Sequence, residues 1–141
     1  MGKRREGREA AVQFLFQDDL NKTEPGALPR ALEEFWKLRE SGPRTRQFAG
    51  ELINGVLGNR EAIDERIKRV TANYELHRLA AVDRNILRVA IYEMLYTEET
   101  PPVVCINEAI EIAKRFGSED SGRFVNGILD RLKEEAARPL R

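Results

Sequence analysis

The amino-acid sequence predicts an all-α fold, a single-domain bundle of about seven helices. Apolar residues recur at helical spacing along most of the chain, and no segment shows the apolar–polar alternation of a half-buried strand. Proline and glycine separate these periodic segments. The segment near 82–96 is apolar on nearly all sides, so we expect it to be the largely buried central helix. A chain of 141 residues is long enough for one sizeable core.

The first half of the chain is expected to form four helices. Residues 21–29 are rich in turn formers, which predicts a connector after the first helix. Beyond Gly58-Asn59, the residues Ile63, Ile67 and Val70 follow the i, i+4, i+7 spacing of an amphipathic helix. The four helices therefore cover about residues 4–20, 30–40, 44–57 and a segment that begins after 59.

The second half is expected to form three more helices, over about residues 82–96, 102–116 and 120–136. Pro102 opens the second of these and Gly117 closes it, as proline and glycine commonly do. Ser118 or Asp120 is expected to cap the last helix through its side-chain oxygen. Gly127 lies in mid-helix, where glycine costs about 1 kcal/mol relative to alanine, so we expect another helix to approach closely there.

The composition excludes several kinds of site. The chain has 24 Lys and Arg and 24 Asp and Glu, so any attraction to nucleic acid must come from local clusters. Cys105 is the only cysteine and His77 the only histidine, which excludes a disulfide framework and a metal site built from several such residues. We expect Cys105 to be a small buried hydrophobe and His77 to lie in a solvated turn.

No segment has the pattern of a membrane span, a secretory signal or a catalytic loop. No apolar run approaches the roughly 20 residues that cross a bilayer, and the charged N-terminus has no apolar segment after it. Glycine-rich phosphate loops and the common nucleophile and zinc motifs are also missing. We therefore expect a cytoplasmic protein that is not an enzyme, holds no metal or cofactor and does not bind membranes.

The N-terminus carries a cluster of cations: Lys3, Arg4, Arg5 and Arg8. On a helix the arginines fall roughly on the arc that Val12 and Leu15 occupy later, so this start should overhang the core or fray. Either arrangement leaves it free to meet an anion such as RNA. The alternative is a solvated basic start in which Arg5 pairs with Glu9 one turn later.

Two further places carry polar or aromatic residues that packing alone does not require. Arg88 lies in the narrow polar wedge of the segment 82–96, where the alternative to an RNA contact is an intramolecular ion pair. Phe124 lies at the edge of an apolar arc, close to Asp120 and Arg123, and core packing is its alternative role. Single-stranded RNA is bound by such groups: aromatic faces stack on bases, carboxylates contact base edges and arginines contact phosphates.

Four segments resemble the bacterial transcription antitermination factor NusB family, and the similarity extends over nearly the whole chain. They cover residues 4–13, 82–93, 102–111 and 119–130. The last two are highly specific, whereas the arginine-rich start alone would be a weak signal. The resemblance implies an all-helical, non-enzymatic, NusB-like RNA-binding domain over residues 1–141.

The resemblance also implies partners. Members of this family pair with NusE, a small-subunit ribosomal protein, and together they hold the single-stranded boxA element of nascent RNA, notably in ribosomal RNA leaders. Through this complex they act indirectly on elongating RNA polymerase and help it pass terminators. Because this chain has no net charge, we expect modest RNA affinity alone, with the basic partner supplying the remainder.

Residues carried over from the family give a candidate site. The expected RNA contacts are Lys3, Arg4, Arg5, Arg8, Phe16, Arg88, Asp120, Ser121, Arg123 and Phe124. Glu75 and Asp83 are the residues expected to contact NusE. Two positions depart from the family pattern: Phe16 stands where tyrosine is familiar, and Gly122 stands where a larger residue, often histidine, is usual.

Two alternatives remain at this point. A similar helical domain precedes the catalytic part of some RNA cytosine methyltransferases, so the chain is also similar to an RNA-binding module of that kind. The other alternative is a helical scaffold that forms a homodimer through exposed apolar surface. Size-exclusion chromatography and RNA titration separate these possibilities.

Overall fold

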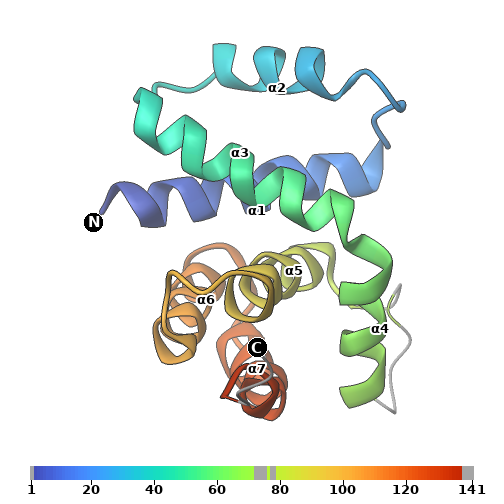
Figure 1. The fold of residues 1–141 in the computed structure, drawn as a ribbon, viewed down its shortest axis with the longest axis vertical. Helices are drawn as coiled ribbons and strands as arrows, with labels where there is room; N and C mark the ends of the chain where they lie inside the picture. The colour runs from blue at the N-terminus through green and yellow to red at the C-terminus, as the bar shows by residue number, and fades with distance from the viewer. Residues whose placement is uncertain (1, 72–75, 77–78, 138–141) are drawn as a thin grey trace.

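The computed structural model describes residues 2–71, 76 and 79–137 (Figure 1). Within these ranges it contains α-helices and no strand, so the predicted all-α fold with seven helices is confirmed. The helices are α1 (Lys3–Leu20), α2 (Leu28–Lys37), α3 (Pro43–Gly58), α4 (Arg60–Val70), α5 (Ala81–Tyr96), α6 (Pro102–Phe116) and α7 (Ser121–Ala137). None of the helices in these ranges is both long enough and apolar enough to cross a bilayer.

The largest difference from the predicted boundaries is at α2. The sequence predicts a helix over 30–40, whereas α2 covers Leu28–Lys37. Pro29 belongs to its first turn, where the missing N–H removes no helical hydrogen bond and the fixed φ suits the helix. The proline that the sequence analysis assigned to a connector therefore begins the helix.

Helix α5 is the centre of the fold, as predicted. It packs against α1, α3, α4, α6 and α7, and Figure 1 shows it with α1 and α3 above it, α7 below it, and α6 and α4 on either side. Most of its residues from Asp83 to Met94 are buried. A helix buried on all sides needs apolar residues around its circumference, which is the pattern of this segment.

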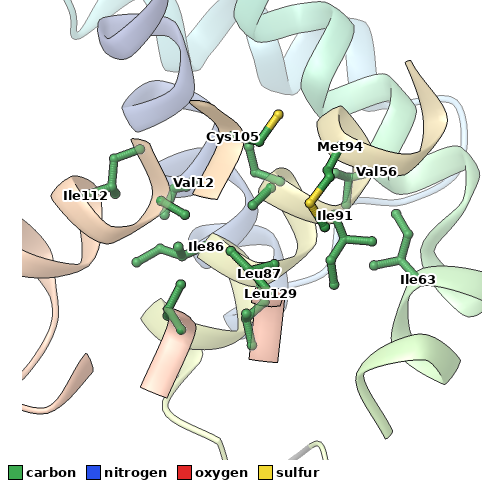
Figure 2. Close-up of a cluster of buried hydrophobic side chains, with 14 of the residues drawn as sticks. Val12, Val56, Ile63, Ile86, Leu87, Ile91, Met94, Cys105, Ile112 and Leu129 are labelled. Carbon is green, nitrogen blue, oxygen red and sulfur yellow. The ribbon is translucent and has the colours of Figure 1, made fainter. Parts of the chain in front are cut away.

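Every helix that packs against α5 contributes side chains to the core. Figure 2 shows Ile86, Leu87 and Ile91 of α5 among side chains of α1, α3, α4, α6 and α7. Each of these three residues is almost completely inaccessible to solvent. Burial of a side chain of this size contributes about 1.5–3 kcal/mol. The core therefore fixes the relative positions of α1 and α7, which carry most of the predicted RNA contacts.

Helix α2 packs against α1 less completely than the other helices pack around α5. None of its residues is fully buried, and its main aromatic contact joins Phe35 to Phe14 of α1, with ring centroids 5.4 Å apart in a T-shaped arrangement. Leu38, which follows α2, is 90% exposed. The incomplete cover leaves two hollows between α1 and α2, each bordered by Phe35 and Leu38.

The turn between α6 and α7 differs from the prediction in its capping. The Ser121 hydroxyl accepts a hydrogen bond of 2.8 Å from the backbone N–H of Ser118, so the side chain inside α7 reaches back to the turn. A Cβ atom at Gly117 would overlap the Ser121 side chain, which explains the glycine there. The expectation for Gly127 is wrong, because no other helix in the described ranges comes within 4 Å of the place its Cβ would take.

Candidate nucleic-acid interface

The basic start of α1 is packed against two other helices. Arg8 binds Glu93 of α5 through hydrogen bonds of 2.8 and 2.6 Å, and both side chains are buried, 6% and 3% exposed. Arg5 binds Glu108 of α6 through bonds of 2.8 and 2.9 Å. The prediction that this start overhangs the core or frays is therefore wrong, because carboxylates of α5 and α6 hold Arg5 and Arg8 against these helices.

The predicted alternative pairs Arg5 with Glu9. In the structure Arg5 donates two hydrogen bonds to Glu108, and the nearby charge of Glu9 adds to the effects that raise the pKa of Arg5. Glu9 binds Arg115 of α6, with Nη1 of the arginine 2.9 and 3.1 Å from the two carboxylate oxygens. The hydrogen bonds from Arg5 hold the pKa of Glu108 below its usual value. The first half of α1 is therefore joined to α5 and α6 by the ion pairs Arg5–Glu108, Arg8–Glu93, Arg8–Glu108 and Glu9–Arg115.

Lys3 and Arg4, in contrast, are exposed. The Arg4 guanidinium lies 4.4 Å from the centre of the Phe48 ring and 3.9 Å from the carboxylate of Glu99. Both cations border an open cleft of about 530 Å³ that also includes Arg44 of α3. At this end of α1, the accessible predicted RNA contacts are Lys3 and Arg4.

Arg88 is part of a buried network and not of the surface. Its Nε and Nη2 donate hydrogen bonds of 2.8 and 2.9 Å to Asp64 of α4, and its Nη1 donates bonds of 3.0 and 2.9 Å to Asp19 of α1. The Arg88 side chain is only 5% exposed. The structure thus shows the intramolecular ion pair that was the alternative, and an RNA contact from Arg88 stays a prediction.

Asp19 accepts hydrogen bonds from Arg84, Asn85 and Arg88, which share the polar wedge of α5. Burial alone would raise the pKa of Asp19, but these donors and the charge of Arg88 lower it overall. The lowered pKa keeps Asp19 ionised, and its hydrogen bonds connect the end of α1 to the first half of α5.

The predicted contacts after α6 differ in their exposure. Asp120 and Arg123 are exposed and Phe124 is partly buried against the core, so these three residues border the surface. Ser121 is buried and its hydroxyl is used in the turn. A Cβ at Gly122 would make only ordinary contacts, at 3.7 Å from Ile110, so the helix leaves room for a larger residue there.

Phe16 lies at a hollow of about 420 Å³ beside α2. Its wall also includes Phe116, the last residue of α6, so two aromatic side chains border one hollow. The Arg115 guanidinium lies 5.0 Å from the centre of the Phe116 ring. The sequence analysis missed both Arg115 and Phe116, although an aromatic residue directly before Gly117 was a visible signal.

The two residues expected to contact a protein partner lie near the start of α5. Asp83 is 9% exposed, and its Oδ1 is buried with no hydrogen-bond partner among the described residues. A buried carboxylate oxygen without a donor is costly, so such an atom is a place where an incoming donor would be favourable. Glu75 and His77 lie outside the described residues.

Cys105 is a buried free thiol, as predicted for a small hydrophobe. Burial and the nearby Glu93 carboxylate raise its pKa to about 12, although Arg8 opposes the shift. No set of three or more His, Cys, Asp or Glu side chains in the described part of the chain is arranged to hold a metal ion.

Comparisons with known sequences give matches over nearly the whole chain. The model of the NusB family matches residues 5–134. Transcription antitermination protein NusB of Sorangium cellulosum is 43% identical over 138 residues, which cover 98% of this chain and 96% of that protein. The protein of the same name from Desulforamulus reducens is 49% identical over 138 residues, with 95% and 94% of the two chains covered.

Solved structures show the same fold. The structure of T. maritima NusB matches with a TM-score of 0.83 at 38% identity, covering 98% of this chain and 94% of that chain. A chain in a crystal structure of antitermination factors NusB and NusE in complex with double-stranded RNA matches with a TM-score of 0.79 at 27% identity, covering 95% and 98%. By its sequence and its fold, this chain belongs to the NusB family.

Proposed function

We propose that this protein is a non-enzymatic transcription antitermination factor that binds the single-stranded boxA element of nascent RNA together with NusE. The observation that carries the proposal is the likeness to a chain solved in complex with NusE and RNA, at a TM-score of 0.79. Acting in the cytoplasm, the complex would join elongating RNA polymerase indirectly and favour passage through terminators, especially in ribosomal RNA leaders. No bond is made or broken in this activity.

The RNA surface that we propose consists of the accessible members of the predicted set: Lys3, Arg4, Phe16, Asp120, Arg123 and Phe124. Exposed cations bind phosphates, and partly open aromatic rings stack on bases. The paired residues Arg5, Arg8 and Arg88 have a different role in this proposal. Their ion pairs hold α1 against α5, α6 and α4, so they keep the two ends of the surface at a fixed separation.

This surface predicts weak, salt-dependent RNA binding by the protein alone. Stacking of a base on Phe124 would contribute about 1–3 kcal/mol. If Lys3, Arg4 and Arg123 each neutralise one phosphate, log K should fall with log salt at a slope of about −0.7 × 3, or roughly −2. A slope of this size fits a protein without net charge that depends on a basic partner for tight binding.

The NusE contact that we propose lies at the start of α5, around Asp83, together with Glu75 eight positions earlier in the sequence. The unpaired Oδ1 of Asp83 would accept a hydrogen bond or an ion pair from a basic side chain of NusE. Because both proposed residues are acidic, they suit a basic ribosomal protein. An Asp83→Asn variant keeps the side-chain shape, and we expect it to weaken NusE binding in the absence of RNA.

Fluorescence anisotropy with a labelled boxA-type RNA tests the RNA proposal. We would titrate the wild type and the variants Arg123→Ala and Phe124→Leu, each with and without NusE, at two salt concentrations. Leucine at position 124 keeps apolar contact with the core but removes the aromatic face. Salt-sensitive binding that NusE tightens, and that both variants weaken, is the expected result.

Two controls separate this result from its alternatives. Circular dichroism shows whether each variant is folded, and size-exclusion chromatography shows whether the protein is a monomer or a homodimer. If the folded wild type does not bind this RNA with or without NusE, the proposed RNA function is wrong even though the family assignment stands.

A further inference from the structure

Three arginines of α1 and α5 already use, in hydrogen bonds to carboxylates, a guanidinium edge that could bind a phosphate. Arg5, Arg8 and Arg88 each give both Nε and Nη2 to one carboxylate, on Glu108, Glu93 and Asp64 respectively. The Nε–Nη2 edge of a guanidinium is one that binds carboxylate or phosphate through two parallel hydrogen bonds. An RNA strand that crosses this region must therefore find other cations.

Arg115 of α6 differs from these arginines in the atoms that it uses. Its hydrogen bonds to Glu9 come from Nη1 alone, and neither Nε nor Nη2 donates to any residue in the described part of the chain. The Arg115 side chain is 57% exposed, whereas that of Glu9 is 8% exposed. The pair is thus asymmetric: the carboxylate is inside, and much of the guanidinium is accessible.

Two contacts hold the Arg115 guanidinium in place before any ligand arrives. The Glu9 carboxylate fixes Nη1, and the Phe116 ring lies 5.0 Å from the guanidinium carbon, within the range of a cation–π contact. A guanidinium held in this way loses less conformational freedom when it binds a phosphate. Among the described residues, the same contacts leave the Nε–Nη2 edge without a protein partner.

The place of Arg115 in the fold also suits an RNA contact. Its neighbour Phe116 lines the same hollow as Phe16 of α1. After Gly117, the turn leads directly to Asp120 and the start of α7. Arg115 therefore lies between the two groups of proposed RNA contacts, one on α1 and one at the α6–α7 turn.

We infer that Arg115 is a further RNA-binding residue, which holds a phosphate through its Nε–Nη2 edge while Glu9 and Phe116 keep the guanidinium in position. The inference rests on the proposed RNA-binding function and adds a contact that the family-derived set does not contain. Glu9 has a double role, because its carboxylate orients Arg115 and also repels an approaching phosphate.

This arrangement predicts opposite effects of two substitutions. Arg115→Gln removes the cation and leaves the Glu9 charge, so RNA affinity should fall about fivefold and the salt slope should become shallower by about 0.7. Glu9→Gln removes the opposing charge and keeps the cation, so RNA affinity should rise about threefold at low salt. A purely structural ion pair would give the same sign for both variants.

The control is Arg69→Gln. Arg69 on α4 is also 57% exposed and also pairs with a carboxylate, that of Glu135 at 3.4 Å, and Figure 1 shows α4 and α6 on different sides of α5. This variant makes the same change in net charge, so it corrects for long-range attraction. Anisotropy titrations of a boxA-type RNA at three salt concentrations, with thermal unfolding of each variant, complete the comparison.

The inference is supported if Arg115→Gln weakens RNA binding more than Arg69→Gln does and its salt slope is shallower. Equal effects of these two variants overturn it, and so does a loss of NusE binding in the absence of RNA, because Arg115 would then contact protein. If Glu9→Gln does not fold, the comparison of Arg115→Gln with Arg69→Gln is sufficient to test the inference.

If the wild-type protein does not bind RNA, the proposed function itself is wrong. This outcome differs from the two that overturn the inference, because in those the wild type still binds RNA.

Discussion

Arg88 on α5 and Asp64 on α4 share two hydrogen bonds, of 2.8 and 2.9 Å. The remaining terminal nitrogen of Arg88 binds Asp19 on α1, so one guanidinium joins three helices. Removing one partner of a buried ion pair leaves an uncompensated charge, whereas replacing the whole pair by apolar groups is often tolerated. We therefore infer that the network contributes more to the specificity of the helix arrangement than to the net stability of the fold.

We expect Arg88→Ala to lower the free energy of unfolding by about 3–5 kcal/mol, because Asp64 and Asp19 would lose their common cation inside the protein. Urea denaturation followed by circular dichroism measures this change. Arg69→Ala serves as the control, since its exposed pair with Glu135 should contribute at most about 1 kcal/mol. Equal unfolding midpoints for the two variants would show that the buried network does not stabilise the fold.

The stability of the protein should fall in acid. The hydrogen bonds from Arg5 lower the pKa of Glu108, and the donors around Asp19 lower its pKa despite the opposing effect of burial. Unfolded glutamate and aspartate have pKa values of about 4.3 and 3.9. A carboxylate whose pKa is lower in the folded than in the unfolded state stabilises the fold fully at pH values above its unfolded pKa. This stabilisation is lost as the pH falls through the folded pKa.

Urea unfolding at pH 7, 5, 4 and 3 tests this expectation. The free energy of unfolding contributed by these carboxylates should change little between pH 7 and 5 and decrease below about pH 4. Glu108→Gln removes one of the responsible groups, so its decrease in acid should be smaller than that of the wild type. An identical acid profile for this variant would show that Glu108 does not contribute.

Much of the fold could be predicted because its signals are local. Pro102 and Gly117 mark the two ends of α6, and the apolar circumference of 82–96 correctly identified the buried central helix. These patterns depend on residues that are close in the sequence. The start of α2 was less clear, because a proline fits both a connector and the first turn of a helix.

The electrostatic pairing of the site could not be predicted in the same way. Arg8 and Glu93 are 85 positions apart, and Arg5 and Glu108 are 103 positions apart. Only the packing of α1 against α5 and α6 brings these charges together. Helical periodicity placed the arginines on the core side of α1 but had no information about the carboxylates opposite them. It therefore suggested an overhang where the structure has one buried and one partly buried ion pair.

Cys105 should be inert in the folded protein. It is 2% exposed and its pKa is raised to about 12, chiefly by burial, so little thiolate exists at pH 8. We expect a thiol reagent such as a disulfide dye to react slowly with the native protein at pH 8 and rapidly in concentrated urea. Rapid reaction of the native protein would mean that the start of α6 opens readily.

Glycines 127 and 117 should respond in opposite directions to alanine. Gly127 is in an exposed part of α7, and in the described part of the chain no other helix comes within 4 Å of a new Cβ. Alanine restricts the unfolded chain and favours the helix, so Gly127→Ala should raise the free energy of unfolding by about 1 kcal/mol. Urea denaturation with the wild type as reference measures the gain.

Gly117→Ala makes the same chemical change at a crowded position. The new Cβ would overlap the Ser121 side chain and displace the hydroxyl that accepts the Ser118 N–H. We expect it to destabilise the protein and, by shifting the α6–α7 turn, to weaken RNA binding more than its loss of stability explains. If both alanine variants shift the unfolding midpoint in the same direction, the space around these two glycines does not determine their effect.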